Sequence, residues 1–142
     1  HNNAVGYYRY FLEHDIILKV STIAIAEYCV RGDLLDLPLR NLMVLPSYSH
    51  HSVKAGTMMS YVYEEKKRRG AIIPLRAIIP NDTKMFAQAD VEEDICYYAT
   101  ADSECGKIYN LLKTSDCISP SFRFIDISTP FSTYFGELDF EI

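Results

Sequence analysis

Apolar positions in the first part of the chain change from helical to strand-like spacing and back again. Residues 5–14 carry aromatic and aliphatic side chains near helical spacing, which predicts a helix. The β-branched run over residues 16–20 predicts a short strand. Ser21 or Thr22 can cap a second helix, which continues to Arg31 and ends at Gly32. The pattern therefore predicts helix, strand and helix in succession.

The rest of the chain alternates in the same way after a connection that contains Pro38. The spacing predicts a long helix over residues 51–69 that ends at Gly70, a strand over 77–79, a helix that begins at 81–83 and covers 85–93, a strand over 95–100, a helix over 105–113 and a strand over 122–127. Strands separated by helices favour a mainly parallel sheet with helices on both faces. The sequence thus predicts an α/β fold.

The composition fits one globular domain over residues 1–142, with residues 128–142 as a C-terminal extension. Hydrophobic residues make up 49% of the chain and charged residues 23%, as in ordinary globular domains. No apolar run approaches the roughly 20 residues of a membrane span, and no signal-peptide pattern follows His1. We therefore expect a soluble, cytoplasmic protein without membrane contact. The four cysteines form no close pair, so free and mostly buried thiols are expected.

Three acidic residues follow predicted strands closely. Glu27 lies in the helix after the first strand, Asp82 at a helix start, and Asp102 two residues beyond the strand that ends at Thr100. In open α/β sheets, sites form beyond the carboxyl ends of the strands. Carboxylates that meet there repel one another unless protons or hard divalent cations relieve them. A shared pocket would therefore indicate a metal site suited to phosphodiester hydrolysis.

Simpler interpretations of the same three acids stay open. Asp82 can be an acid favoured by the helix dipole, Asp102 a turn residue, and Glu27 a solvated helical position. Spacing alone favours these interpretations over a metal site. The net charge of −5 also argues against an electrostatic grip over the whole surface, so any nucleic acid would be held locally.

Three segments resemble the acidic motifs of PIN domains, in family order. Residues 20–28 (VSTIAIAEY) are similar to the second motif, a strand followed by a helix that carries a Glu. Residues 80–84 (PNDTK), running into 86–89 (FAQA), resemble the third motif. Residues 98–102 (YATAD) resemble the fourth, in which a strand ends in Thr-x-Asp. The resemblance extends from His1 to about Ile127.

The resemblance implies a three-layer α/β/α fold with a central, mainly parallel sheet, and a divalent-metal-dependent ribonuclease that cleaves single-stranded RNA. Glu27, Asp82 and Asp102 would be catalytic residues that hold Mg²⁺ or Mn²⁺, and the Thr100 hydroxyl would help to shape the site. Small PIN domains are commonly toxins of toxin–antitoxin pairs, so an antitoxin protein is an expected partner. The second hypothesis is a catalytically impaired PIN-like module that binds RNA or protein.

Two departures from the family pattern motivate that second hypothesis. The first PIN motif, a strand that ends in an Asp-Thr-Asn-like sequence, does not precede His1, and the chain has Cys105 where the family often has another acid. Glu104 is a candidate substitute for that acid. Because the first strand is central in PIN domains, flanked here by residues 16–20 and 77–79, we expect a strand-and-turn segment before His1.

Other residues have plainer interpretations. Residues 66–69 (KKRR) could contact RNA but are typical of a solvated helix end, and His50 and His51 are expected at a helix N-terminal turn rather than at a metal. Eleven tyrosines and seven phenylalanines suit core or homodimer packing better than base stacking. The apolar residues 131–142 are expected to pack on the domain or on a partner.

Overall fold

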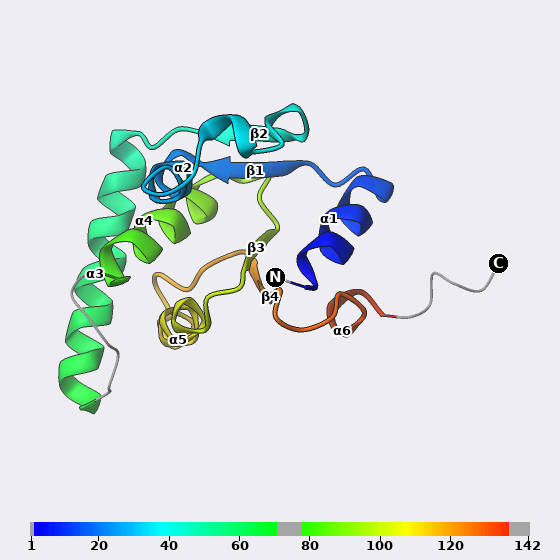
Figure 1. Cartoon of the computed structure of the whole chain (residues 1–142). Helices are drawn as coiled ribbons and strands as arrows, with labels where there is room; N and C mark the ends of the chain where they lie inside the picture. The colour runs from blue at the N-terminus through cyan, green and yellow to red at the C-terminus, as the bar shows by residue number, and fades with distance from the viewer. Residues whose placement is uncertain (1, 71–77, 137–142) are drawn as a thin grey trace.

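The computed structural model describes residues 2–70 and 78–136 and has a mixed α/β architecture (Figure 1). Its elements, in chain order, are α1 (Ala4–Glu13), β1 (Leu18–Ser21), α2 (Thr22–Tyr28), the 3₁₀ turns η1 (Leu34–Asp36) and η2 (Leu39–Asn41), β2 (Leu42–Leu45), α3 (Ser49–Arg69), α4 (Ile78–Val91), β3 (Tyr97–Thr100), α5 (Ser103–Leu112), β4 (Arg123–Asp126) and α6 (Ser132–Phe135). The α/β class expected from the pattern is confirmed.

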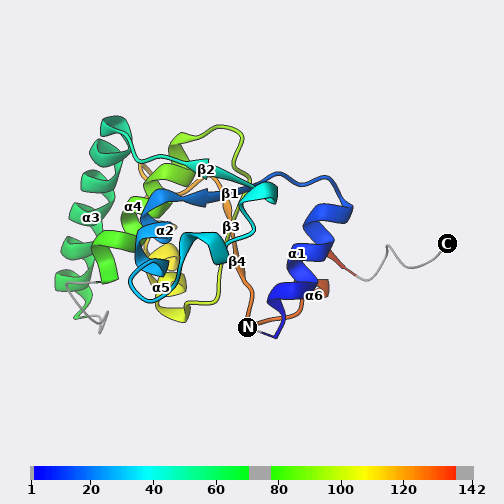
Figure 2. The ribbon, with the colours of Figure 1, turned by 45° about the horizontal axis from the view of Figure 1, so that its top comes forward.

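The strands form two separate parallel pairs. β1 pairs with β2, Leu18 opposite Leu42, and β3 pairs with β4, Tyr97 opposite Arg123. Within the described ranges no ladder joins β1 to β3, so each pair is a half-sheet of its own. Figure 2 shows β2, β1, β3 and β4 following one another across the molecule.

Three expectations about the elements are corrected. The strand expected over 77–79 is wrong, because Ile78 and Ile79 begin α4, while residue 77 lies outside the described part. Pro80 is tolerated there because the first helical turn needs no backbone donor. β2 was not expected from the pattern. α2 ends at Tyr28, well before Arg31, and the Tyr28 ring lies so close to Gly32 that a Cβ on this glycine would come within 2.5 Å.

The main core lies between α3, α4 and α5. Met58 and Val62 of α3, Phe86 of α4, and Ile108 and Leu112 of α5 are fully buried in it. α3 ends where Gly70 adopts a positive φ of 57°, a conformation that glycine enters without the cost of a Cβ. The predicted stop of this helix is confirmed.

A second core lies between α1, α6 and the opposite face of β4. Tyr7, Phe11 and Ile125 are buried there, with Phe131 and Phe135 packed against them. The Tyr7 hydroxyl donates to the Thr129 carbonyl at 2.7 Å and ties α1 to the segment after β4. Residues 131–136 therefore pack on the domain, as expected, whereas residues 137–142 lie outside the described part.

The buried side chain of Gln88 attaches α4 to the β1–β2 half-sheet. Its Oε1 accepts from the Ser21 hydroxyl at 2.5 Å, and its Nε2 donates to the Leu45 carbonyl at 3.3 Å. No helix among the residues described is long and apolar enough to cross a bilayer.

The four cysteines are free, but they are not mostly buried. Cys29, Cys96 and Cys117 are exposed, and Cys105 alone among them is buried. The exposed three lie at the end of a helix, before a strand and in a loop, where few side chains can cover them.

Candidate acidic site

The three predicted acids come from three elements and lie close enough to interact. Glu27 is on α2, Asp82 is in the N-terminal part of α4, and Asp102 caps α5 directly after β3. Burial raises the pKa of Asp82 from 3.8 to about 6, helped by the charge of Asp102 and then by that of Glu27. The fold thus gathers residues that are far apart in sequence around one carboxylate.

Asp82 is the buried member of the group. Its side chain is 7% exposed, and its Oδ2 atom has no hydrogen-bond partner among the described residues. The Cys105 thiol hydrogen-bonds to the carboxylate. A buried anion with an oxygen that lacks a donor is costly, because the desolvation of that oxygen is not compensated. A cation at Oδ2 would remove this cost.

Tyr98 and Cys105 form the uncharged wall behind Asp82. The Cys105 sulfur lies 4.0 Å from the Tyr98 hydroxyl oxygen. Burial and the neighbouring Asp82 raise the pKa of the Cys105 thiol, and burial raises the pKa of Tyr98 well above its usual value. Both groups therefore stay protonated near neutral pH and add no negative charge to the site.

Asp102 and Thr100 form the turn from β3 into α5. The Asp102 N–H donates to Thr100 Oγ1 at 3.1 Å, and Asp102 Oδ1 accepts from the Glu104 N–H at 2.9 Å as the helix N-cap. One carboxylate oxygen of Asp102 is thus used by the cap. Thr100 contributes by fixing this turn through its hydroxyl.

Glu27 is held by a neighbour that the sequence did not single out as a site residue. Asn81 donates from Nδ2 to Glu27 Oε1 at 2.7 Å, which links α2 to α4. Tyr98 and Cys105 were likewise not proposed as part of the site. Asn81 and Tyr98 lie within motif segments that carry an acid, and Cys105 occupies the position where the family often has another acid.

Glu104, the suggested substitute acid, lies in the first turn of α5. Its Oε1 accepts from Lys107 Nζ at 2.7 Å, and its Oε2 is buried without a hydrogen-bond partner in the described part of the chain. Glu104 is not among the main charges that raise the pKa of Asp82. It is therefore a neighbour of the Asp102 turn rather than an established member of the acidic group.

The three carboxylates are not drawn tightly together. Among the described residues, the group of three potential metal ligands whose atoms all lie within 4.8 Å of one another is His50, His51 and Glu92. At least one separation between the oxygens of Glu27, Asp82 and Asp102 therefore exceeds 4.8 Å. Such spacing leaves room for a cation with water between it and some of the ligands.

Hydrogen bonding at His51 disfavours a metal at the histidine group. His51 is 1% exposed, its Nδ1 accepts from the Tyr48 N–H at 2.9 Å, and its Nε2 lies 3.0 Å from Glu92 Oε1. With Nδ1 acting as acceptor, the ring proton sits on Nε2 and is donated to Glu92. A metal bound at Nε2 would force the ring proton onto Nδ1. There the proton would face the Tyr48 N–H, and the hydrogen bond from that N–H would be lost. His51 instead stabilises the start of α3 and joins it to α4.

The basic residues at the end of α3 are also largely engaged. Arg68 and Arg69 both contact the Glu65 carboxylate, at 2.7 and 2.8 Å. Because both arginines pair with a glutamate of their own helix, this segment is typical of a solvated helix end rather than of a phosphate-binding site.

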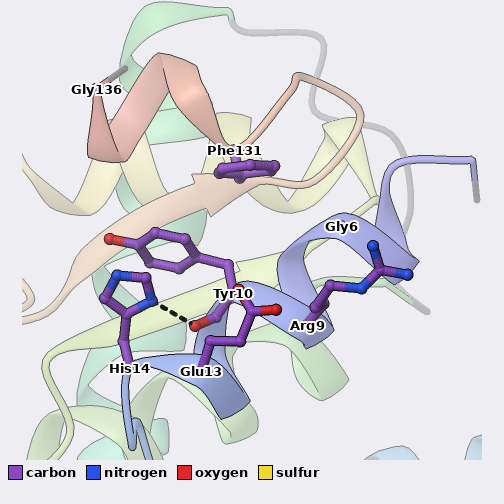
Figure 3. A pocket seen from close by; sticks show the side chains of 7 residues that line it. All are labelled: Gly6, Arg9, Tyr10, Glu13, His14, Phe131 and Gly136. Carbon is purple, nitrogen blue, oxygen red and sulfur yellow. Dashed lines mark hydrogen bonds between the residues drawn. The ribbon is translucent and has the colours of Figure 1, made fainter. Parts of the chain in front are cut away.

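A separate aromatic hollow of about 340 Å³ lies between α1 and the segment around α6 (Figure 3). The Tyr10 ring stacks on His14 at 3.9 Å between ring centres and on Phe135 at 4.6 Å. The hollow is lined by Gly6, Arg9, Tyr10, Glu13, His14, Phe131 and Gly136. None of the acids proposed from the sequence lines it.

No family model, curated protein or solved structure matches the chain.

Proposed function

We propose that this protein is a divalent-metal-dependent ribonuclease that cleaves single-stranded RNA, with Glu27, Asp82 and Asp102 as the ligands of Mg²⁺ or Mn²⁺. The observation that carries the proposal is Asp82, a buried carboxylate with one unpartnered oxygen whose pKa is raised to about 6. Strongly perturbed carboxyl groups next to like charges are typical of functional sites.

The donors fit a hard cation. All three side chains offer carboxylate oxygens, which Mg²⁺ and Mn²⁺ prefer, and the nearby thiol of Cys105 stays protonated and is a poor ligand in that form. When bound, such a cation lowers the pKa of a water molecule and offsets the charge that develops on an attacked phosphate.

The chain's own residues would prepare this chemistry in distinct ways. Asp82 gives up its proton near neutral pH, because its pKa is about 6. Thr100 holds the turn that carries Asp102, and Asn81 orients Glu27 through the 2.7 Å hydrogen bond. The acidic group repels RNA phosphate unless a cation intervenes, so metal and substrate binding should be coupled.

The proposal also covers the fold, the biological role and the partner of the protein. It includes a three-layer PIN-like fold, a toxin role in the cytoplasm and an antitoxin partner that covers the acidic group. Helices on both faces of the β3–β4 half-sheet support the layered arrangement, since Phe124 of β4 packs against the main core and Ile125 of the same strand lies in the second core.

A PIN-like module that binds RNA or protein without cleaving it is the second candidate. It is favoured by the spacing of the acids, which do not all meet within 4.8 Å, and by the neutral Cys105 beside Asp82. Such a module would use the same surface without turnover.

Cleavage of fluorescent single-stranded RNA in Mn²⁺ or Mg²⁺, with and without chelator, tests the proposal. We expect chelator-sensitive cleavage that Asp82→Asn and Asp102→Asn each reduce by about a hundredfold or more, by analogy with the loss of a key charge-stabilising group. Asp116→Asn is the matched control, because Asp116 is exposed in the loop after α5.

Cleavage that survives both substitutions would point to a contaminating nuclease and contradict the proposal. RNA binding without chelator-sensitive cleavage, weakened by the same two substitutions, would instead favour the binding module.

A further inference from the structure

Exposed apolar side chains gather in one stretch of the chain, from the end of α2 to β2. The large hydrophobic residues exposed there, which we call the β2 surface, are Tyr28, Val30, Leu34, Leu35, Met43 and Val44. This stretch lies on the outside of the molecule, with η2 packed beside β2 (Figure 1). Single exposed apolar side chains are ordinary, but a group of this size typically marks a contact with another molecule.

β2 is the outer strand of its half-sheet. One edge of β2 pairs with β1, and no other strand in the described part of the chain joins the opposite edge. Alternate residues of a strand direct their backbone N–H and C=O groups to opposite edges, so β2 presents such groups on its free side. Met43 is 55% exposed and Val44 47%. Because neighbouring side chains of a strand point to opposite faces, the centre of β2 is open on both faces.

The sequence of β2 lacks the features that normally keep an edge strand from pairing. Natural edge strands are protected by charged side chains, above all lysine, by proline or by bulges. The four residues of β2, LMVL, include no charged residue and no proline, and they pair with β1 in an unbroken register. Such an edge is typical of a strand that another strand covers.

The turn before β2 holds its apolar side chains in a fixed position. Asp33 Oδ1 accepts from the Leu35 N–H at 2.9 Å, and Asp36 Oδ2 accepts from the Asp33 N–H at 3.3 Å, which forms a capping box. Asn41 donates from Nδ2 to the Tyr8 hydroxyl at 2.7 Å and anchors the start of β2 on α1. Leu35 is nevertheless 90% exposed. Its side chain therefore gains nothing from burial within its own chain.

The charges beside the β2 surface are balanced. Arg31 and Arg40 are positive, Asp33 and Asp36 are negative, and all four are exposed. Neither arginine forms an ion pair within the part of the chain that the structure describes. In a two-fold interface the same surface meets itself, so both signs of charge must be present on that surface. Equal numbers of the two signs suit a second copy of this chain better than a strongly charged partner.

We infer that the β2 surface is the interface of a homodimer, in which β2 pairs antiparallel with β2 of a second copy. Opposed residues of an antiparallel pair have the same orientation, so the two-fold axis would pass beside Met43 or Val44. The two β1–β2 half-sheets would then form one continuous sheet, with the two β2 strands at its centre. The inference rests on the strand edge and its surroundings and is independent of the proposed nuclease activity.

Sedimentation of the 142-residue chain over a range of concentrations gives the first test. We expect a reversible equilibrium between monomer and dimer. Met43→Lys places a charge at the centre of the strand pair and should raise the dimer Kd by at least about tenfold. Leu35→Lys should also raise it, and this side chain is too exposed for the change to disturb the fold. Tyr63→Lys is the matched control, because Tyr63 is exposed in the second half of α3, which extends away from β2 (Figure 1).

Amide hydrogen exchange locates the contact and is the second test. Of the Met43 and Val44 amides, one faces the free edge of β2. Its exchange should slow by about tenfold or more as the concentration rises and the dimer forms, whereas the amides of α5 should not respond.

A chain that is still monomeric at about 1 mM, where even a weak dimer is populated, contradicts the proposal. A dimer whose Kd changes equally in Met43→Lys and Tyr63→Lys, or whose β2 amides do not respond to concentration, contradicts it as well. Binding of an apolar peptide to β2 in a chain that does not self-associate would assign the edge to a different protein and overturn the homodimer.

Discussion

The negative charge of Asp82 lowers the stability of the folded chain, because the carboxylate is buried near two other acids. Its pKa of about 6 in the folded chain lies above the value of 3.8 expected when it is solvated. Ionisation therefore favours the unfolded chain. The stability that depends on this group is highest below about pH 4 and falls as the pH rises to about 6, where the penalty becomes constant.

Asp82→Asn should therefore stabilise the metal-free protein in a pH-dependent way. The amide is neutral at all pH values, so the gain should be small near pH 4 and approach at most about 3 kcal/mol near pH 7.5, following the pKa difference. Urea unfolding at both pH values in chelator measures it. A pH-independent loss of stability would mark Asp82 as a structural residue instead.

Asp102 and Glu27 should control the titration of Asp82 unequally. Asp102→Asn should lower the pKa of Asp82 more than Glu27→Gln does, because the Asp102 charge is the larger of the two effects. Carboxyl ¹³C NMR titration reads the change directly. Asp102→Ala should shift the pKa like Asp102→Asn but cost about 1 kcal/mol more, since alanine cannot cap α5. An unchanged Asp82 titration in Asp102→Asn would contradict the site geometry.

At the scale of elements, hydrophobic spacing predicted the helices better than the strands. α3 and its stop at Gly70 follow directly from local sequence, because the helix and its cap are decided within the segment. β2 has only four residues, and its pairing with β1 depends on a distant segment. The apolar residues 78 and 79 suited a strand equally well, and only the position of Pro80 hints at a helix start.

The candidate site was predictable only in part for the same reason. The acids after β1 and β3 follow from motif order, but their spacing depends on how the half-sheets twist. Cys105 and Tyr98 belong to the fourth-motif region of the sequence, but the hydrogen bond from Cys105 to Asp82 and the burial of Tyr98 arise only in the assembled core. Asn81 is recognisable only once α2 and α4 are seen side by side.

His51 should contribute much more to the α3–α4 contact than Glu92 does. His51→Ala leaves the Tyr48 N–H and the Glu92 carboxylate without their partner and opens a cavity, at a cost of about 3 kcal/mol. Glu92→Gln should cost below about 1 kcal/mol, because the amide oxygen still accepts from Nε2. Chemical denaturation of the two variants tests this. A rise in Tm with Zn²⁺ that His50→Ala abolishes would contradict the assigned ring proton.

For the molecule as a whole, the β3–β4 half-sheet separates two cores of different size. Phe86 belongs to the main core between three helices, and Phe11 to the second core between α1 and α6. The aromatic second core depends on the segment after β4, which the Tyr7–Thr129 hydrogen bond secures.

Phe11→Ala and Phe86→Ala should therefore destabilise different parts of the molecule. Each removes the same type of side chain and should lower the free energy of unfolding of the core it belongs to by about 3 to 5 kcal/mol. Phe11→Ala should speed amide exchange in α1 and leave α3 and α5 nearly unchanged, whereas Phe86→Ala should speed exchange throughout. Native-state exchange mapped by residue distinguishes the two. Uniform acceleration in both variants would indicate one cooperative unit.

The parallel pairing of both half-sheets also bears on how the chain reaches its fold. The two strands of each pair are joined by a segment that contains a helix, within residues 18–45 for one pair and 97–126 for the other. Each pair can therefore form before the other does. Parallel pairing nevertheless requires chain closure over many residues, which slows the search for the native contacts. Until α4 docks against both units, their strand edges are open to other chains. Newly synthesised chains should thus be most vulnerable to misassembly at this intermediate stage.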